Sequence, residues 1–112
     1  MTADRRRVRA TAAFFDDVDR QLPAERTADG RPSAHDFQVF ELLGVVEAFA
    51  TQFDALPELI PGRPEYRILI AAGRIVASYS VVGQLAADGA VELIELEVDT
   101  DRGWLIDDDG GD

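Results

Sequence analysis

The side chains that most enzymes use for catalysis are scarce in this sequence, so any chemistry would rest mainly on arginine and carboxylate groups. The chain has no cysteine, no lysine and a single histidine, His35. Thiolate chemistry, disulfides and cysteine zinc sites are therefore excluded, and neither a histidine relay nor a multi-histidine metal site can form. No P-loop, dinucleotide fingerprint or calcium loop is present. We therefore expect the protein to use no metal and no other cofactor.

Two further features could suggest a site and are better interpreted as solvent-exposed. His35 lies next to Asp36, near the expected start of a helix. The sequence contains no serine or cysteine motif that a histidine base could activate. Asp16, Asp17 and Asp19 could suggest a cation site. Neighbouring carboxylates on a helix point around it rather than toward one another, however, so a solvated face is the simpler interpretation.

Three segments in the second half of the chain are predicted to be strands, because apolar and polar residues alternate along them. They are residues 66–71, 74–81 and 91–98, with tight turns or loops between them. The core face is expected to carry Tyr66, Ile68 and Ile70, then Ile75, Ala77, Tyr79 and Val81, then Ile94, Leu96 and Val98. The opposite face is expected to be open, polar and concave, and to present Arg67, Ser78, Ser80, Glu95 and Glu97. This open face is where we expect a site.

The first half of the chain begins with a predicted strand and helix. Apolar residues alternate with polar ones over residues 7–13, which favours a short strand with one buried face. The spacing then changes to that of a helix over residues 14–22, which Pro23 ends. Residues 24–32 are polar and contain an Asp-Gly turn signal, so we expect a loop there.

A second helical region follows and completes the domain. Ser33 is a good N-cap, and apolar residues continue at helical spacing to Phe53. Gly44 disfavours an uninterrupted helix, so the region is either one kinked helix or two shorter ones. Three prolines make residues 56–64 an irregular connection. The order predicts a two-layer α+β domain over residues 1–98, with the helices on one face of the sheet.

The formal net charge of −11 excludes some partners. Such a chain repels a phosphate backbone unless its positive charge is concentrated, so direct nucleic-acid binding is not expected. No apolar run is long enough to span a membrane, no secretory signal is present, and cysteine is absent; we therefore expect a cytoplasmic protein.

Residues 99–112 form an acidic tail, which is either solvated and disordered, or a lure for a basic partner, or a mimic of nucleic acid. Trp104 begins a short apolar triplet within this tail that we expect to fold back onto the domain.

The predicted order of strand, helix, helix and three-stranded meander resembles the RelE/ParE toxin superfamily, the toxin half of bacterial toxin–antitoxin pairs. The segment from Leu56 to Val81 carries most of the resemblance, since GRPEYRILI leads through a glycine turn into RIVASYSV. The Tyr66-Arg67 pair is similar to the family's "YR" element, and Phe14 to Leu22 resembles its first helix. The resemblance implies a toxin that cuts mRNA on the ribosome or poisons DNA gyrase. It also implies an antitoxin that wraps a helical or extended segment over the toxin.

The ribonuclease activity of that family needs a group to take the 2′-hydroxyl proton, positive charge at the phosphate and an acid for the leaving oxygen. Arg67 matches the strand arginine that the resemblance implies as catalytic. The lysines of the family's set have no counterpart here, and past the last strand the chain offers Arg102 and Trp104 but neither tyrosine nor histidine. Glu95 and Glu97 are expected beside Arg67, where they would repel a phosphate. Arg67 is thus either a structural ion-pair partner or a phosphate-binding residue, and the incomplete catalytic set favours a protein that is not an enzyme.

These observations predict a toxin-family protein that acts by binding a small antitoxin-like protein with a basic segment. The alternatives are an active mRNA interferase using Arg67, a gyrase-directed toxin, and a non-toxic stand-alone domain of the same fold. The predicted partner surface consists of Arg63, Tyr66, Arg67, Arg74, Ser78, Ser80, Glu95, Glu97 and Trp104.

Overall fold

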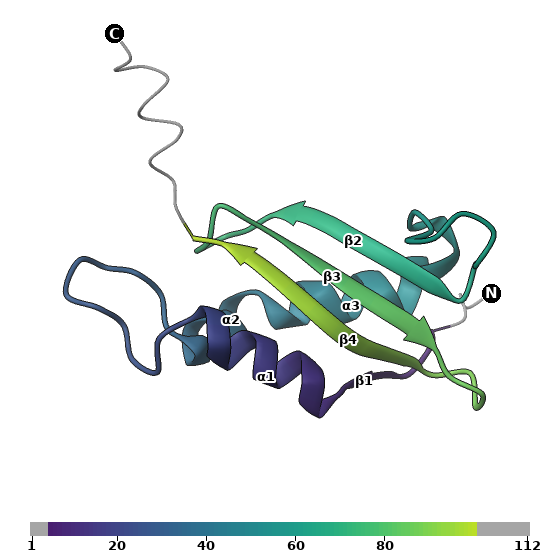
Figure 1. Ribbon diagram of the computed structural model, residues 1–112, viewed down its shortest axis with the longest axis horizontal. Helices are drawn as coiled ribbons and strands as arrows, with labels where there is room; N and C mark the ends of the chain where they lie inside the picture. Colours follow the sequence, from purple (N-terminus) through teal and green to yellow (C-terminus); the bar gives the residue numbers. More distant parts are fainter. Residues whose placement is uncertain (1–4, 101–112) are drawn as a thin grey trace, which may run out of the picture.

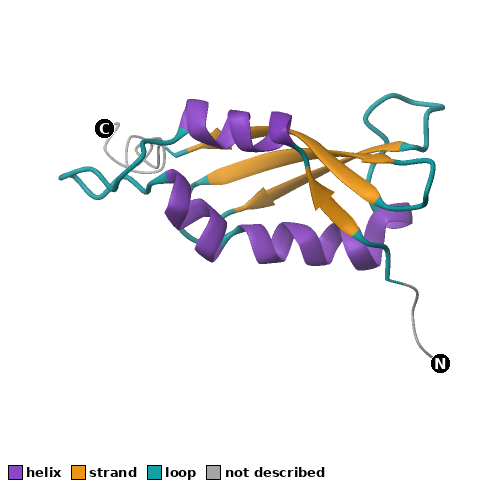
Figure 2. Cartoon of the chain, turned by 90° about the horizontal axis from the view of Figure 1, so that it is seen from below, coloured by secondary structure: helices purple, strands orange, loops and turns teal. Residues whose placement is uncertain are grey.

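The computed structural model describes residues 5–100 of the chain as three helices packed on one four-stranded sheet (Figure 1). The described elements are, in order, β1 (Val8–Ala10), α1 (Ala12–Gln21), α2 (Ala34–Phe40), α3 (Leu42–Gln52), the 3-10 turn η1 (Phe53–Ala55), β2 (Tyr66–Ala72), β3 (Ser78–Leu85) and β4 (Val91–Asp99). The α+β prediction is therefore confirmed. Figure 2 shows α1 beside the α2–α3 pair on the same face of the sheet.

The helices start where the sequence offers caps. Thr11 accepts a hydrogen bond from the Phe14 amide, which begins α1. Ser33 begins α2 with a capping box, in which its hydroxyl accepts from the Asp36 amide and the Asp36 carboxylate accepts from the Ser33 amide. The second helical region consists of two helices rather than one kinked helix. They meet at Glu41, and Gly44 lies inside α3.

The sheet is mixed, with the strand order β1-β4-β3-β2. The last three strands form an antiparallel meander as predicted, with Tyr66 opposite Gln84 in one pair and Ser78 opposite Asp99 in the other. The bounds predicted for the middle strand, residues 74–81, were wrong, because β3 begins at Ser78 and continues to Leu85. The short N-terminal strand β1 lies parallel to β4, with Val8 opposite Val91. This pairing places the start of the chain beside its last described strand, and β1 and β2 form the two edges of the sheet.

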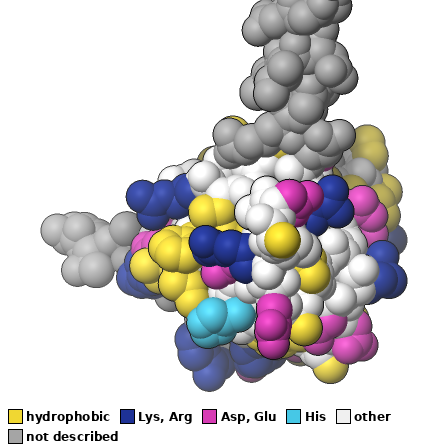
Figure 3. Space-filling view, turned by 90° about the vertical axis from the view of Figure 1, so that its left-hand side faces the viewer, with side chains coloured by type: hydrophobic (Ala, Val, Ile, Leu, Met, Phe, Trp, Pro, Cys, Tyr) yellow, Lys and Arg dark blue, Asp and Glu magenta, His cyan; other side chains and the backbone are white. Residues whose placement is uncertain are grey.

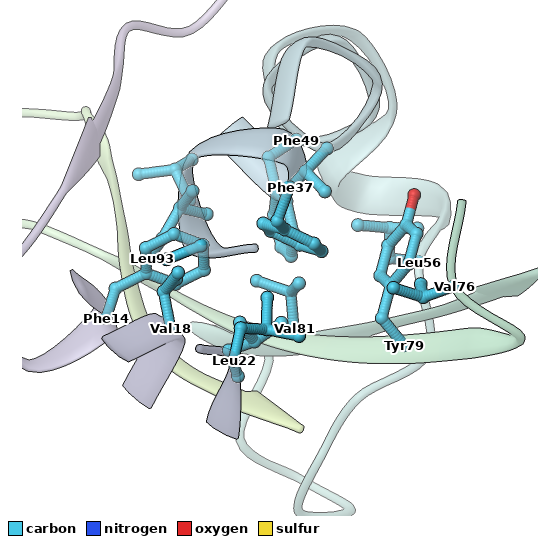
Figure 4. Close-up of a cluster of buried hydrophobic side chains, with 14 of the residues drawn as sticks. Phe14, Val18, Leu22, Phe37, Phe49, Leu56, Val76, Tyr79, Val81 and Leu93 are labelled. Carbon is cyan, nitrogen blue, oxygen red and sulfur yellow. The ribbon is translucent and has the colours of Figure 1, made fainter. Parts of the chain in front are cut away.

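The core lies between the helices and the sheet (Figure 4). Its largest fully buried side chains come from all layers: Phe14 and Val18 from α1, Phe37 and Phe49 from α2 and α3, and Leu93 from β4. In β3 the core face carries Tyr79 and Val81, as the alternation predicted. Figure 4 shows these side chains pointing toward one another between the layers.

The prediction for the two faces of β2 was wrong, because they are reversed. Ile70 is 71% exposed, whereas Leu69 and Ala71 pack against the core. Arg67 is paired with Gly83, and a side chain on Gly83 would collide with the Phe49 ring of α3, so both residues face the helices. Tyr66, Ile68 and Ile70 therefore belong to the open face. Both faces of this strand carry apolar residues, so alternation alone did not distinguish them.

A bulge in β4 corrects a second prediction. Val82 is opposite Glu95 and Gly83 is opposite Leu93, so Ile94 has no partner in β3. The extra residue shifts the alternation, as bulges do. The core face of β4 therefore carries Leu93 before the bulge and Leu96 after it. The prediction that Ile94 lies on that face was wrong.

Candidate functional site

The face of the sheet that is turned away from the helices, called here the open face, changes from apolar to acidic across three strands. Ser80 lies between Ile70 of β2 and Glu97 of β4, and Ile70, Ser78, Ser80, Glu97 and Asp99 help to line a shallow hollow there. Two residues further along β3, Val82 is flanked by Ile68 and Glu95. Neighbouring strands lie about 4.8 Å apart, so apolar and carboxylate groups are within reach of one bound segment.

Glu95 and Glu97, called here the carboxylate pair, supply the acidic side of the open face. Both are exposed, and neither has an ion pair within residues 5–100. Their neighbour Glu92 differs, because Arg9 approaches its carboxylate to 3.2 Å and Gln84 donates to it at 3.3 Å. The structure thus neutralises one end of β4 and leaves the carboxylate pair available to a cation from outside.

Arg67 lies on the other side of the sheet and is not beside the carboxylate pair, so the expected ion pair with Glu95 or Glu97 was wrong. Its Nε donates to the carbonyl of Pro64 at 2.7 Å, and its Nη1 donates to the carbonyls of Asp54 at 2.9 Å and Leu56 at 2.8 Å. The guanidinium also lies 5.4 Å from the centre of the Phe53 ring. Arg67 therefore ties β2 to the connection that precedes it. Its predicted catalytic role remains a prediction.

The remaining predicted surface residues are dispersed. Arg63 pairs with Glu65 at 2.8 Å, and its guanidinium lies 5.4 Å from the centre of the Tyr66 ring. The hydrogen bond to Glu65 raises the pKa of Arg63. A hydrogen bond from the backbone of Glu65 itself and, second, the bond from Arg63 lower the pKa of the Glu65 carboxyl. Arg74 is exposed in the β2–β3 turn, beside α2 and α3 rather than on the open face. Trp104 lies outside the described residues. The structure thus brings together Ser78, Ser80 and the carboxylate pair.

The basic N-terminal segment is dispersed among acidic side chains. Arg5 makes two hydrogen bonds of 2.9 Å to Glu47 of α3, and Arg6 lies 3.6 Å from Asp54. Arg7 and Arg9 both contact Asp88, at 3.3 and 3.0 Å. These ion pairs neutralise the densest positive segment of the sequence.

Sequence reasoning missed Glu41, which is buried and only 3% exposed. One of its oxygens accepts hydrogen bonds from three successive amides of the β2–β3 turn, those of Arg74, Ile75 and Val76, at 2.7, 2.8 and 3.4 Å. Burial and, second, the Glu41 carboxylate raise the pKa of Tyr79. The signal in the sequence was a single acid within an otherwise apolar stretch between two helices.

Within residues 5–100, no group of three or more histidine, cysteine, aspartate or glutamate side chains is arranged to hold a metal ion. In the same part of the chain, no helix combines the length and the apolar content that crossing a membrane requires. No protein-family model matches the chain, and neither a curated protein nor a solved structure is significantly similar to it.

Proposed function

We propose that this protein is a RelE/ParE-like toxin-family protein that acts by binding a small, antitoxin-type protein partner with a basic segment. The observation that supports this proposal best is the open face, where the unpaired Glu95 and Glu97 lie two strands from the exposed Ile70. An exposed apolar residue beside unpaired carboxylates fits a segment that carries both apolar and basic side chains.

A bound segment would lie across β2, β3 and β4. Its apolar side chains would cover Ile68 and Ile70, the serines of β3 would hydrogen-bond to polar groups between them, and its arginine or lysine side chains would reach the carboxylate pair. The net charge of −11 would increase the rate at which a basic partner associates. Because surface charges are screened by salt, binding should weaken as ionic strength rises.

The ribonuclease alternative has less support. Within residues 5–100, the hydrogen bonds of the Arg67 guanidinium go to backbone carbonyls on the helix side of the sheet, and the open face presents carboxylates where a phosphate would need cations. No observation favours the gyrase-directed or the non-toxic stand-alone alternative. An Arg67→Ala test of toxicity would be ambiguous, because losing those hydrogen bonds also disturbs the fold.

The test is affinity capture of proteins from the native host with the full chain as bait, using the wild type and two charge-reversed variants. The first variant is Glu95→Lys/Glu97→Lys. The control is Asp19→Lys/Glu25→Lys, which makes the same change in net charge at exposed acids outside the open face. Wild type and control should retain the same small protein with a basic segment, and the first variant should lose it.

Two results would contradict the proposal. One is a partner that all three baits retain equally, because its binding would not depend on the open face. The other is purified wild-type protein that cuts mRNA, with Glu95→Gln/Glu97→Gln leaving the cutting unchanged, because the open face would then be irrelevant to an enzymatic function.

A further inference from the structure

The two sides of the sheet differ in how the backbone groups at their edges are bonded. Beyond the short strand β1, the edge of β4 is bonded to side chains of α1. Asp17 accepts a hydrogen bond from the Leu96 amide at 2.9 Å. Gln21 donates to the Leu96 carbonyl at 2.6 Å and accepts from the Val98 amide at 2.7 Å. The chain itself therefore closes this stretch of the β4 edge.

The edge of β2 is closed along its first half only. Pairing with β3 leaves the N–H and C=O groups of every second residue, from Tyr66 to Ala72, pointing away from the sheet. The connection before β2 reaches the first of these groups and lies beside the start of the strand (Figure 1). The Leu59 amide donates to the Tyr66 carbonyl, and the Ile68 amide donates to the Pro57 carbonyl, both at 3.0 Å.

The second half of this edge, called here the bare edge, consists of the Ile68 carbonyl, both backbone groups of Ile70 and the Ala72 amide. Within residues 5–100, no hydrogen bond reaches these groups. Proteins commonly protect an edge strand with a charge, a proline or a bulge. Residues 68–73 contain neither a charged residue nor a proline, and their pairing with β3 is regular. The bare edge is therefore able to pair with a further strand.

Apolar side chains lie on both sides of the bare edge. On the open face, Ile70 is 71% exposed. On the helix side, a hollow lined in part by Leu43, Gly44 and Ala72 adjoins the end of β2. Figure 3 looks onto this end of the molecule and shows hydrophobic side chains gathered beside basic ones. Successive side chains of an added strand would point to these two regions in turn.

We propose that the bare edge binds an extended segment of a protein partner as a fifth strand beside β2. The donors and acceptors of the bare edge have the spacing that an extended backbone matches, and apolar side chains of the segment cover Ile70 and enter the hollow. The net charge of −11 favours a neutral or basic segment over an acidic one, and disfavours a second copy of this chain. The open face would bind through side chains and the bare edge binds through backbone groups, so this inference goes beyond the proposed function and does not rest on it.

The test is backbone amide hydrogen exchange of the full chain, measured by NMR with and without a probe peptide. The probe alternates valine and threonine and has an arginine at each end and blocked termini. At a probe concentration about ten times its Kd, the Ile70 and Ala72 amides should exchange about tenfold more slowly, since only unbound chains leave them exposed. The Leu96 and Val98 amides are already bonded to α1 and should not change, so they serve as the internal reference.

A control peptide separates backbone pairing from attraction by charge. It has the same side chains as the probe and carries N-methyl groups on its central amides, so it keeps the charge and loses the donors. The control should bind much more weakly than the probe and leave the exchange of the Ile70 and Ala72 amides unchanged.

Two variants at residue 72 test the same hydrogen bonds from the side of the protein. Ala72→Pro removes an amide that has no partner within residues 5–100, and an edge strand tolerates proline at such a position. Ala72→Val keeps the amide and adds a side chain of similar size. Ala72→Pro should bind the probe about fivefold or more weakly than Ala72→Val, because a carbonyl of the peptide is left without its donor.

Several results overturn the proposal. One is slow exchange of the Ile70 and Ala72 amides in the free full chain, because the bare edge would then already be covered by the chain itself or by a second copy. Another is a probe that leaves both amides unchanged. Equal binding of probe and control peptide, or of the probe to the two variants, also overturns it. The exchange measurement uses the wild type, so it decides the proposal even if Ala72→Pro does not fold.

Discussion

Glu41 shows how one side chain connects two layers of this molecule. Within the described part of the chain it is the only buried charged side chain, and no arginine neutralises it. Its partners are the amides of the β2–β3 turn, which would otherwise lose their hydrogen bonds with water. A carboxylate that accepts several amide hydrogen bonds forms charge-assisted bonds, which are stronger than neutral ones. Glu41 thus attaches this turn to the junction between α2 and α3.

Glu41→Ala is expected to lower the free energy of unfolding by about 2 kcal/mol or more, because it leaves partly buried amides without an acceptor. Glu41→Gln should cost less, since an amide oxygen can still accept one of these hydrogen bonds. The measurement is urea unfolding followed by circular dichroism. Glu95→Ala is the matched control and should change stability little, because Glu95 is exposed. Equal effects of Glu41→Ala and Glu95→Ala would show that Glu41 does not have this structural role.

At the scale of the elements, a glycine in β3 allows α3 to approach the sheet. Gly83 is buried opposite Arg67, and an added Cβ would collide with an edge carbon of the Phe49 ring. Phe49 is fully buried, so the ring has little room to move. The absence of a side chain at Gly83 therefore determines how closely α3 packs on β3. Gly83 also lies next to the bulge, where the alternation of β4 changes.

Gly83→Ala and Gly44→Ala are expected to change stability in opposite directions. Gly83→Ala should destabilise the protein by roughly 1–3 kcal/mol, because the methyl group overpacks the core against Phe49. Gly44→Ala should stabilise the single chain by about 1 kcal/mol, because alanine favours the helix and no atom of the chain obstructs it. Thermal unfolding of both variants and of the wild type measures these changes. A stabilising Gly83→Ala would contradict the close packing described for this strand.

At the scale of the whole molecule, ion pairs between distant segments hold the N-terminal strand to the rest of the sheet. Asp88 lies in the β3–β4 loop and forms ion pairs with both Arg7 and Arg9. These arginines are 81 and 79 residues away from it in the sequence. Hydrogen bonds from Arg9 and from the Ala90 amide lower the pKa of Asp88 to about 2. A comparable pair between Arg26 and Asp36 lowers the pKa of Asp36 to about 2 and joins the α1–α2 loop to α2.

These pairs predict a loss of stability in acid. Both carboxyls have a pKa near 3.8 when unpaired and about 2 when folded, so folding favours their charged form. Their contribution is complete above the unfolded value and is lost as the pH falls from about 4 toward 2. The measurement is the melting temperature of wild type and Asp88→Asn between neutral pH and pH 2.5. The difference between the two proteins should shrink across this window, and a constant difference would contradict the lowered pKa of Asp88.

The sequence by itself determined the α+β class, the cap at Ser33 and the presence of a three-stranded meander, because caps, helical spacing and alternation are local properties of the chain. It did not identify the cap at Thr11, which was assigned to the first strand, or the bounds of the middle strand. It also identified the serines and carboxylates of the open face, since Ser80 alternates with the buried Tyr79 and Val81, and Glu95 and Glu97 flank the buried Leu96. Only the tertiary structure decided which face of β2 is buried, because that strand is apolar on both sides. Arg67 of β2 faces the helices because it binds backbone carbonyls of a preceding segment, and Gly83 of β3 leaves the space that Phe49 occupies. These groups are distant from one another in sequence, so alternation within one strand contains no information about them.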